Sequence, residues 1–439
     1  MTMESATSMQ AYKQSRRQWW QRNWFIMLPL AVYLATYAVV FPGIDSVDAN
    51  WQRQMFADWT FSKQHSVLST FVFGIIGGDQ LWLCNLMQSI IFAACIITAL
   101  AVLAPRVSRR ALLIASLAWS FYPLFPAYAV SCVKDVLCAG FTLLLCVEVF
   151  AIIDSKGAML RNPWFLAGLT LTLFVTNEYR KNNFLFIGMI VLFLLIRYRR
   201  EWKRLLVVLV AFAALTGAWG AYCDYGLKAQ PAATTEMLGV PLMQVSYIYY
   251  EDLHGNPQHL PAQADAYFQA VRPQAQWAAN YEKQRLVVMD NKISDLTGAD
   301  LGEFLGNWAS LCFANFGTCV KAYALFEGSL LNPLQVTDDQ YSILGGVLHM
   351  DKAAAGQSAL AWAPRVVFNL AVIDWMLIAL AVLAYRRGMR ELLPLFLIPL
   401  GIAISLMLAA LAVQLRLMLG AIILIPFLAA LILGRERRA

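Results

Sequence analysis

The sequence predicts an all-α integral membrane protein: a polytopic bundle of about ten transmembrane helices with a mostly helical extracytoplasmic domain between the seventh and eighth helices. Two observations lead to this fold class. Of the 439 residues, 60% are hydrophobic and only 14% are charged, whereas about a quarter of the residues of a soluble domain are charged. The apolar residues also occur in runs, many of them close to the roughly 20 residues that cross a bilayer as a helix.

Ten apolar runs are the expected transmembrane helices. They cover residues 24–41, 81–104, 111–124, 136–153, 164–176, 184–196, 205–222, 366–385, 392–413 and 417–433. A further apolar stretch, 71–77, is too short to span and is expected to be re-entrant or interfacial. The first run starts late and lacks a small-residue cleavage site, which indicates a retained helix rather than a signal peptide.

Basic residues support this layout because they cluster on one side of it. By the positive-inside rule, that side faces the cytoplasm, so both termini are expected there and the protein in the cytoplasmic membrane. Twenty of the 34 Lys and Arg residues belong to this set: Lys13, Arg16, Arg17, Arg22, Arg106, Arg109, Arg110, Lys156, Arg161, Arg197, Arg199, Arg200, Lys203, Arg204, Arg386, Arg387, Arg390, Arg435, Arg437 and Arg438.

The layout divides the chain into three parts. Residues 1–222 form an N-terminal transmembrane bundle whose first outer loop, 42–66, is the expected catalytic loop. Residues 223–365 form the extracytoplasmic domain, and 366–439 the C-terminal transmembrane helices. Residues 223–365 carry 14 Asp and Glu against 8 Lys and Arg, which argues against a nucleic-acid partner.

The outer segment contains short pieces rather than one long element. Residues 239–250 are apolar and aromatic and are expected to lie on the membrane, whereas 262–271, 277–288 and 300–322 have helical spacing. Trp308, Phe313 and Phe316 are expected to form an apolar face that docks on the bundle. Cys312 and Cys319 form either a disulfide or two buried thiols, and the sequence leaves both alternatives open.

The first outer loop carries two carboxylates three residues apart. Asp45 and Asp48 follow Pro42-Gly43 directly after the first apolar run. A carboxylate in this position can act as a general base towards an acceptor hydroxyl or bind a cation. Alternatively, Asp45 or Ser46 caps a helix that begins near Val47. His65, at the end of the loop, is a candidate substrate-binding residue.

Three outer helix mouths carry cations on the side that the positive-inside rule keeps poor in Lys and Arg. They are Lys134-Asp135, Arg180-Lys181-Asn182-Asn183, and Arg416. Any one of them alone is explained by a snorkelling side chain. Because charges at membrane depth are costly and usually functional, and because Arg and Lys suit phosphate, the three together predict a pocket for a lipid-linked phosphate.

Other chemistry is poorly supported. The sequence has no phosphate-binding glycine loop, HExxH or GxSxG motif, and His254, His259 and His349 lack metal-ligand spacing. A divalent cation between Asp45 and Asp48 would be a hard, oxygen-bound ion such as Mg²⁺ or Mn²⁺. Glu148 and Asp374 lie inside apolar runs, where a transporter would want them, but structural hydrogen bonding explains two such residues.

The ordered motifs Phe41-Pro42-Gly43, Asp48, Trp51-Gln52, His65, Lys134-Asp135 and Arg180-x-Asn182-Asn183 resemble the GT-C superfamily of polytopic glycosyltransferases, and an uncharacterised bacterial family within or beside it. The resemblance implies that the acid of the first outer loop, here Asp48, is the catalytic base or a metal ligand. It also implies a sugar donor on a polyprenyl phosphate or pyrophosphate. Asp45 is an extra acid, and Ser66 stands where that pattern usually has Pro.

The function expected from the residues and the resemblance is sugar transfer from a polyprenyl-phosphate-linked donor to a glycan or lipid acceptor of the cell envelope. The alternatives are a polysaccharide polymerase or ligase that uses a lipid-linked oligosaccharide, a lipid or solute transporter, and an envelope scaffold. The catalytic candidates are Asp48 and Asp45. The substrate-binding candidates are His65, Lys134, Asp135, Arg180, Asn182, Asn183 and Arg416.

Overall fold

The computed structural model describes residues 21–232, 238–282, 301–335, 368–409 and 414–435. All regular elements in these ranges are helices, which confirms the helical part of the predicted fold class. Among the described residues, five helices are long and apolar enough to cross a membrane, and a sixth qualifies if one bent pair counts as a span. The five are Leu81–Leu103, Lys134–Asp154, Arg199–Gly226, Arg390–Leu408 and Leu415–Gly434. The count of ten spans stays a prediction.

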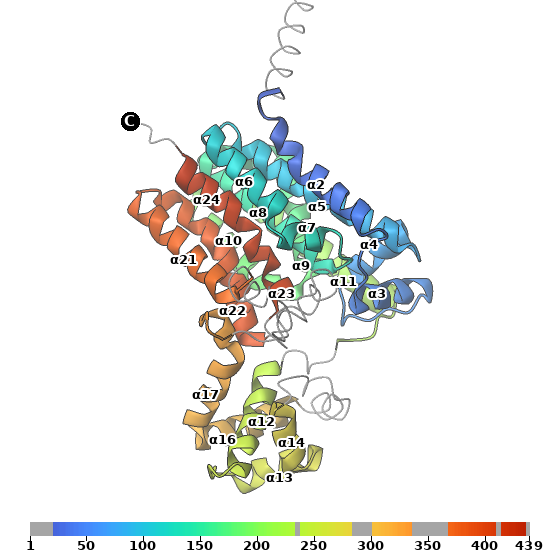
Figure 1. Ribbon diagram of the computed structural model, residues 1–439, viewed down its shortest axis with the longest axis vertical. Helices are drawn as coiled ribbons and strands as arrows, with labels where there is room; N and C mark the ends of the chain where they lie inside the picture. The colour runs from blue at the N-terminus through green and yellow to red at the C-terminus, as the bar shows by residue number, and fades with distance from the viewer. Residues whose placement is uncertain (1–20, 233–237, 283–300, 336–367, 410–413, 436–439) are drawn as a thin grey trace, which may run out of the picture.

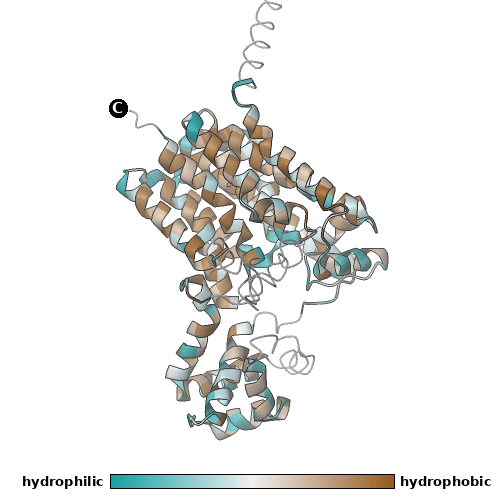
Figure 2. Cartoon of the chain, in the orientation of Figure 1, coloured by the Kyte–Doolittle hydropathy of each residue, from teal (hydrophilic) through white to brown (hydrophobic). Residues whose placement is uncertain are grey.

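Helices from both ends of the chain pack into one bundle (Figure 1). Its members are α2 (Leu28–Val39), α5 (Leu81–Leu103), α6 (Arg109–Phe121), α7 (Leu124–Ala129), α8 (Lys134–Asp154), α9 (Pro163–Tyr179), α10 (Phe184–Arg197), α11 (Trp202–Ala221), α21 (Leu370–Arg386), α22 (Leu397–Ala409), α23 (Leu415–Ile422) and α24 (Leu424–Gly434). Every expected run overlaps one or more of these helices, and Figure 2 shows that most of their residues are hydrophobic.

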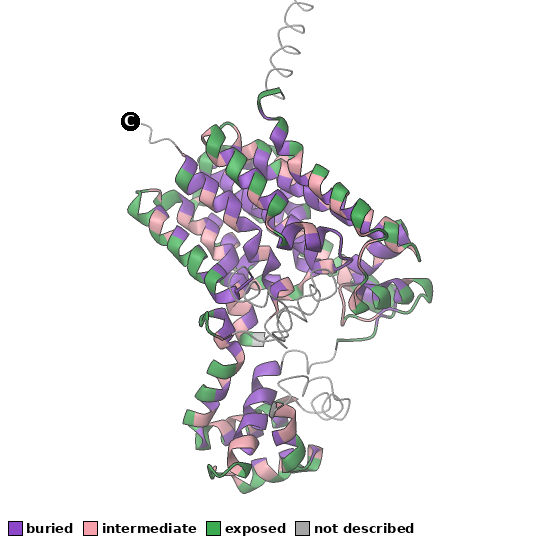
Figure 3. Cartoon of the chain, in the orientation of Figure 1, coloured by how far each residue is buried: buried purple, intermediate pink, exposed green. Residues whose placement is uncertain are grey.

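Helix α8 lies at the centre of the bundle, packed against α5, α9 and α23. It is apolar on all sides, and 78% of its membrane-length window is buried, against 11% for α11. A helix that is hydrophobic all round is either buried or lipid-facing; α8 is the first case and α11 the second. Figure 3 shows the buried residues in the middle of the bundle and exposed ones along the outer edges of α2 and α21.

Charged side chains close the end of the bundle where α5 and α8 finish. Asp154 accepts from Arg106 Nε at 2.8 Å and from Arg435 Nη2 at 2.8 Å, and Arg435 also contacts Glu391 at 3.3 Å. Figure 1 shows the start of α2 and the end of α24 at this same end, away from residues 239–282 and 301–314. Because α8 runs the length of the bundle, its first residues belong to the opposite end.

The segment between α11 and α21 contains helices with an apolar core of their own. These are α12 (Gly239–Leu253), α13 (Ala262–Val271), α14 (Gln274–Glu282), α16 (Leu301–Ala314) and α17 (Phe316–Glu327). Their core includes Tyr249, Phe268, Trp277 and Phe304. The bounds of α13 match the predicted 262–271, whereas residues 283–288 of the expected second helix lie outside the described residues.

Two expectations for this segment are wrong. Helix α12 does not lie on the membrane, because its residues 239–249 are buried against α14, α16 and α17. The expected docking face is also absent. Phe313 and Phe316 are 78% and 66% exposed, and Trp308 instead donates to Gln244 Oε1 at 2.9 Å. Spacing alone does not distinguish an aromatic helix that faces lipid from one that faces a protein core.

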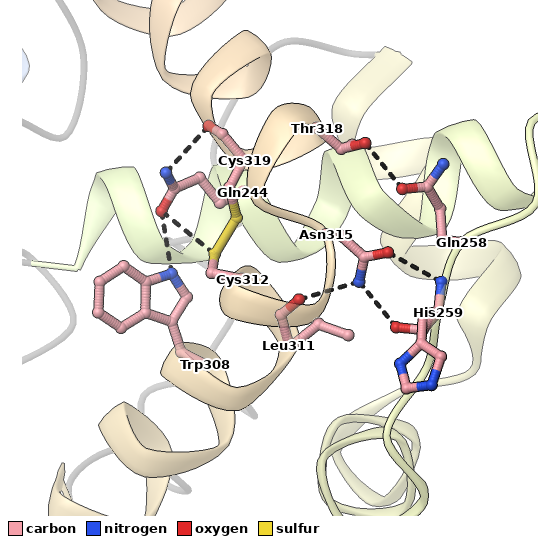
Figure 4. The surroundings of a disulfide bond; sticks show 9 residues. All are labelled: Gln244, Gln258, His259, Trp308, Leu311, Cys312, Asn315, Thr318 and Cys319. Carbon is pink, nitrogen blue, oxygen red and sulfur yellow. Dashed lines mark hydrogen bonds between the residues drawn. A yellow bond between two sulfur atoms is a disulfide. The ribbon is translucent and has the colours of Figure 1, made fainter.

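The expected helix over 300–322 is broken at Asn315, where α16 and α17 meet at 108°. Cys312 and Cys319 form a disulfide across this bend, which decides between the two alternatives (Figure 4). Gln244 of α12 donates to the Cys319 carbonyl at 3.1 Å, and Asn315 Nδ2 donates to the His259 carbonyl at 2.8 Å. The bend is therefore held covalently and by hydrogen bonds to two neighbouring segments.

Glycine allows a close approach of α22 to α10. A Cβ at Gly401 would lie 2.5 Å from Phe186 Cβ and 2.8 Å from Phe186 Cα. We expect Gly401→Ala to lower the melting temperature in detergent, since overpacking costs about 1–3 kcal/mol. Gly188→Ala is the matched control on α10, because nothing lies within 4 Å of its Cβ position. Equal melting temperatures for Gly401→Ala and wild type would contradict this packing.

Candidate active site

The first outer loop is fastened to the segment that leads into α8. Gly43 has φ +93°, and a Cβ there would meet the Asn85 side chain at 2.4 Å, so both the conformation and the space require glycine. After the turn, Ile44 N donates to the Val130 carbonyl at 2.9 Å, and Cys132 N donates to the Ile44 carbonyl at 2.8 Å. This pairing brings the loop beside the start of α8.

The loop continues as α3 (Val47–Ala57), which Ser46 caps. Ala49 N donates to Ser46 Oγ at 3.1 Å, as expected of an N-cap serine. Asp45 instead accepts two hydrogen bonds from Arg53 of the same helix, at 3.1 and 2.8 Å. Burial lowers the pKa of Arg53 but the Asp45 carboxylate raises it more. Asp45 thus closes the loop onto α3 through a bidentate ion pair.

Asp48 lies in the first turn of α3 and pairs with a residue near the other end of the chain. Arg416 Nη1 donates to Asp48 Oδ2 at 2.5 Å, while its Nε donates to Gln414 Oε1 at 2.7 Å. Burial raises the pKa of Asp48, but the Arg416 guanidinium outweighs it and holds that pKa below its ordinary value. Asp48 is therefore an ionised carboxylate at neutral pH.

His65 lies between the loop and α8. Its Nδ1 is 3.5 Å from Lys134 Nζ, and the Trp51 ring meets the imidazole edge-on at 4.9 Å between centroids. Burial, followed by the Lys134 charge, lowers the pKa of His65 to about 4. A neutral imidazole that accepts at Nδ1 from Lys134 carries its proton on Nε2, where it can donate to a ligand.

Arg180 connects the end of α9 to the start of α8 and to α23. Its Nη1 is 3.6 Å from Asp135 Oδ1 and donates to the Leu417 carbonyl at 3.0 Å. Asp135 is 3% exposed and lies in the first turn of α8, where the helix dipole favours a negative charge. These two contacts hold the Arg180 guanidinium beside the start of α8, which carries Lys134 and Asp135.

The two asparagines after Arg180 are not equivalent. Asn183 is buried and donates to the Thr176 carbonyl at 2.9 Å and to Cys138 Sγ at 3.3 Å, which joins α9 to α8. Asn182 is half-buried in the short turn η3 (Lys181–Asn183). The two hydrogen bonds of Asn183 give it a structural role. They do not support its predicted contact with the substrate.

Gln88, a residue that positions the site through hydrogen bonds, was not predicted. Gln88 of α5 donates to the carbonyls of Tyr128, Ala129 and Ser131 at 3.2, 3.3 and 2.6 Å, and its oxygen accepts from Val133 N at 3.2 Å. A buried amide with these bonds holds the chain that precedes Lys134 in one conformation. The signal in the sequence is a polar pair, Gln88-Ser89, inside an apolar run.

The site holds one excess positive charge. Three cations, Lys134, Arg180 and Arg416, face two carboxylates, Asp48 and Asp135, with His65 neutral. Asp48, Arg416 and Asp135 all lie near enough to His65 to act on its pKa. The residues come from the first outer loop, α8, the α9 end and α23, so four separate segments build a basic cluster at one end of the bundle.

The carboxylates do not converge on a common ion. Asp45 and Asp48 are paired with different arginines. In the ranges that the structure describes, no group of three or more His, Cys, Asp or Glu side chains is placed to hold a metal. The donor set therefore does not fit a divalent cation between the two aspartates, a possibility that the sequence left open.

The intramembrane acids lie elsewhere. Glu148 of α8 accepts from Thr172 Oγ1 of α9 at 3.3 Å. Asp374 lies on α21 and is 7% exposed. Neither contributes to the cluster around Asp48. Glu148 thus provides a bond between two helices, in agreement with a structural role.

Among known proteins, the chain has a distant structural similarity but no match in sequence. No protein-family model and no curated protein matches the chain. Among solved structures, the crystal structure of ArnT from Cupriavidus metallidurans bound to undecaprenyl phosphate aligns with 91% of this chain and 77% of that chain, with 15% identity and a TM-score of 0.37.

The depressed pKa of His65 predicts a pH-dependent stability. Between pH 6.5 and about 4 the native imidazole is neutral whereas the unfolded one is protonated. The unfolded state then binds more protons, so this contribution is complete above pH 6.5 and is lost as the pH falls to about 4. We expect the melting temperature to fall across this window, and to fall less in His65→Gln.

The control for this measurement is His259→Gln, which changes an exposed histidine of the outer segment. Its melting temperature should follow the wild-type curve from pH 7 to pH 4. A His65→Gln curve that coincides with wild type over the same range would show that His65 is not held neutral in the folded protein.

Proposed function

We propose that the protein is a membrane glycosyltransferase of the GT-C type. It moves a sugar from a polyprenyl-phosphate-linked donor to a cell-envelope acceptor at the outer face of the cytoplasmic membrane. The observation that carries the proposal is the ion pair between Asp48 and Arg416. This pair joins the candidate general base, Asp48, to a candidate phosphate-binding residue, Arg416, in a cluster that has one excess positive charge. The order of the loop and helix-mouth motifs, which resembles that superfamily, supports the same conclusion.

The donor phosphate binds to the cations of the cluster. Arg416 and Lys134 supply charge-assisted hydrogen bonds, for which phosphate oxygens are good acceptors. His65, neutral and with its Nε2 proton free to donate, adds a bond that needs no counter-ion. Arg180 contributes its charge while its bond to the Leu417 carbonyl keeps it in place. The polyprenyl chain remains in the bilayer.

Binding of the phosphate activates Asp48. When a donor phosphate takes over Arg416, Asp48 loses the partner that lowers its pKa, and the carboxylate becomes a stronger base. Asp48 then takes the proton of the acceptor hydroxyl as the acceptor oxygen forms a bond to the anomeric carbon. The bond between that carbon and the phosphate oxygen breaks, and its electron pair leaves with the polyprenyl phosphate. Direct displacement inverts the anomeric centre.

Asp45 takes no part in this step. Its carboxylate is occupied by the two bonds from Arg53, which is itself only 8% exposed. Asp45 therefore holds the loop in shape while Asp48 performs the chemistry. This division of roles separates the two acids that the sequence presented as a pair.

Asp48→Asn should abolish transfer, by at least about 100-fold, because the amide cannot accept the proton. The measurement is the release of undecaprenyl phosphate from undecaprenyl-phosphate sugars by the protein in nanodiscs, followed by mass spectrometry. Asp58→Asn, which changes the exposed acid at the end of α3, is the matched control. Full activity of Asp48→Asn would end the assignment of Asp48 as the base.

Undecaprenyl phosphate should raise the melting temperature of the wild-type protein, because a ligand of the folded state stabilises it by mass action. The shift should be lost in Arg416→Gln and in Lys134→Gln. It should persist in Lys63→Gln, since Lys63 belongs to the same outer loop but pairs with Asp224. If wild type and all three variants show no shift, with folding confirmed, the protein has no lipid-phosphate site at these residues.

A further inference from the structure

The bend between α16 and α17 directs its central polar side chain inward and its large apolar side chains outward. Asn315 Oδ1 accepts from His259 N at 2.8 Å, and Asn315 Nδ2 donates to the His259 carbonyl at 2.8 Å (Figure 4). Phe313 and Phe316, which flank Asn315, are 78% and 66% exposed. A surface in contact with water has the reverse arrangement, with its polar groups outward and its large apolar groups buried.

Covalent and polar contacts hold the bend in this shape. The disulfide between Cys312 and Cys319 closes residues 313–318 into a loop. Thr318 Oγ1 donates to Gln258 Oε1 at 2.8 Å, so a second polar side chain of the bend is directed to the outer segment. The two exposed phenylalanines therefore belong to a loop that is fastened from within.

The apolar surface continues from the bend along α17. Val320, Ala324 and Leu325 are exposed on this helix. Lys321 lies on the same face, but its Nζ is 3.1 Å from Glu251 Oε1 of α12, so its charge is directed to the outer segment. Single exposed apolar residues are ordinary, whereas a contiguous apolar surface marks a contact with a membrane or with another protein.

The same surface is continuous with the outside of the transmembrane bundle. The short helix η8 (Gly328–Leu330) follows α17 and packs on α21. Trp375 Nε1 of α21 then donates to the Leu331 carbonyl at 2.9 Å. Both of these side chains are exposed, as are Ile378 and Val382 further along α21. Because α21 presents apolar side chains on the outside of a membrane bundle, its exposed face contacts lipid, and lipid is the partner continuous with α17.

The bent pair is suited to the membrane surface and is too short to cross the membrane in either leg. At 1.5 Å per residue, the 14 residues of α16 and the 12 residues of α17 extend about 21 Å and about 18 Å. The hydrocarbon core is about 30 Å thick. Tyr323 Oη of α17 donates to the Met407 carbonyl near the end of α22 at 3.2 Å. Helix α23, which carries Arg416, follows α22, so α17 joins the bundle at the end that holds the Asp48 cluster.

We propose that the α16–α17 bend is a membrane anchor, which inserts Phe313 and Phe316 into the lipid leaflet on the side of the Asp48 cluster. The exposed face of α17 lies at the boundary between acyl chains and headgroups, where a helix with one apolar face binds and aromatic rings are favoured. The ammonium of Lys321 stays in the polar layer above. The anchor holds the outer segment beside the membrane, whatever reaction the Asp48 cluster performs.

The test is photo-crosslinking of the full chain in liposomes of dioleoyl phosphatidylcholine. Replacing Phe316 with p-benzoylphenylalanine keeps an aromatic side chain that, under ultraviolet light, bonds to C–H groups in contact with it. We expect a protein whose mass is increased by one lipid. The same replacement at Ile378, on the exposed face of α21, should give a similar yield of this adduct. Gln263, exposed on α13, is the control position and should give no adduct.

The other results overturn the proposal. If position 316 gives no lipid adduct while position 378 does, the bend does not contact lipid. If position 263 gives as much adduct as position 316, the bend has no contact that the rest of the outer segment lacks. If position 316 gives crosslinked dimers in place of lipid adducts, the apolar surface is occupied by a second copy of the chain. Replacement of Phe313, the more exposed of the two phenylalanines, serves if the variant at Phe316 does not fold.

Discussion

The ion pair between Asp48 and Arg416 joins the first part of the chain to the last at one end of the bundle. The residues are 368 positions apart, and both are partly buried, with exposed fractions of 28% and 23%. A charge in such a position is costly unless it is paired. The pairing therefore determines where the first outer loop lies relative to α23, and the contacts of Ile44 with Val130 and Cys132 place the same loop on α8.

The two ends of the bundle use charge differently. At one end, the two carboxylates of Asp154 and Glu391 neutralise Arg106 and Arg435, so paired charges join the ends of α5, α8 and α24. At the other end, the cluster around Asp48 keeps a positive charge in excess. Helix α8 begins in the second cluster with Lys134 and ends in the first with Asp154, and its buried apolar length fixes the distance between them.

Hydropathy predicted the helices well because each long apolar run has one favourable structure in a bilayer. It failed where the same pattern has two solutions: the aromatic run of α12 suits a membrane surface and a protein core equally, and burial against α14 and α17 decides it. For the site, the sequence supplied the charged residues at the helix mouths. It did not supply the long-range partners, because Arg416 reaches Asp48, and Gln88 reaches the chain before Lys134, only when distant segments come together.

The same pair that positions the loop also regulates the base in the proposed reaction. With Arg416 on Asp48, the carboxylate has a depressed pKa and is a poor proton acceptor. A bound donor phosphate competes for Arg416, and each hydrogen bond that the guanidinium transfers to phosphate is one that Asp48 loses. Base strength therefore rises only when the donor is present. An acceptor or a water molecule that enters first meets a carboxylate that is already occupied, so donor binding and proton transfer are coupled through a single arginine.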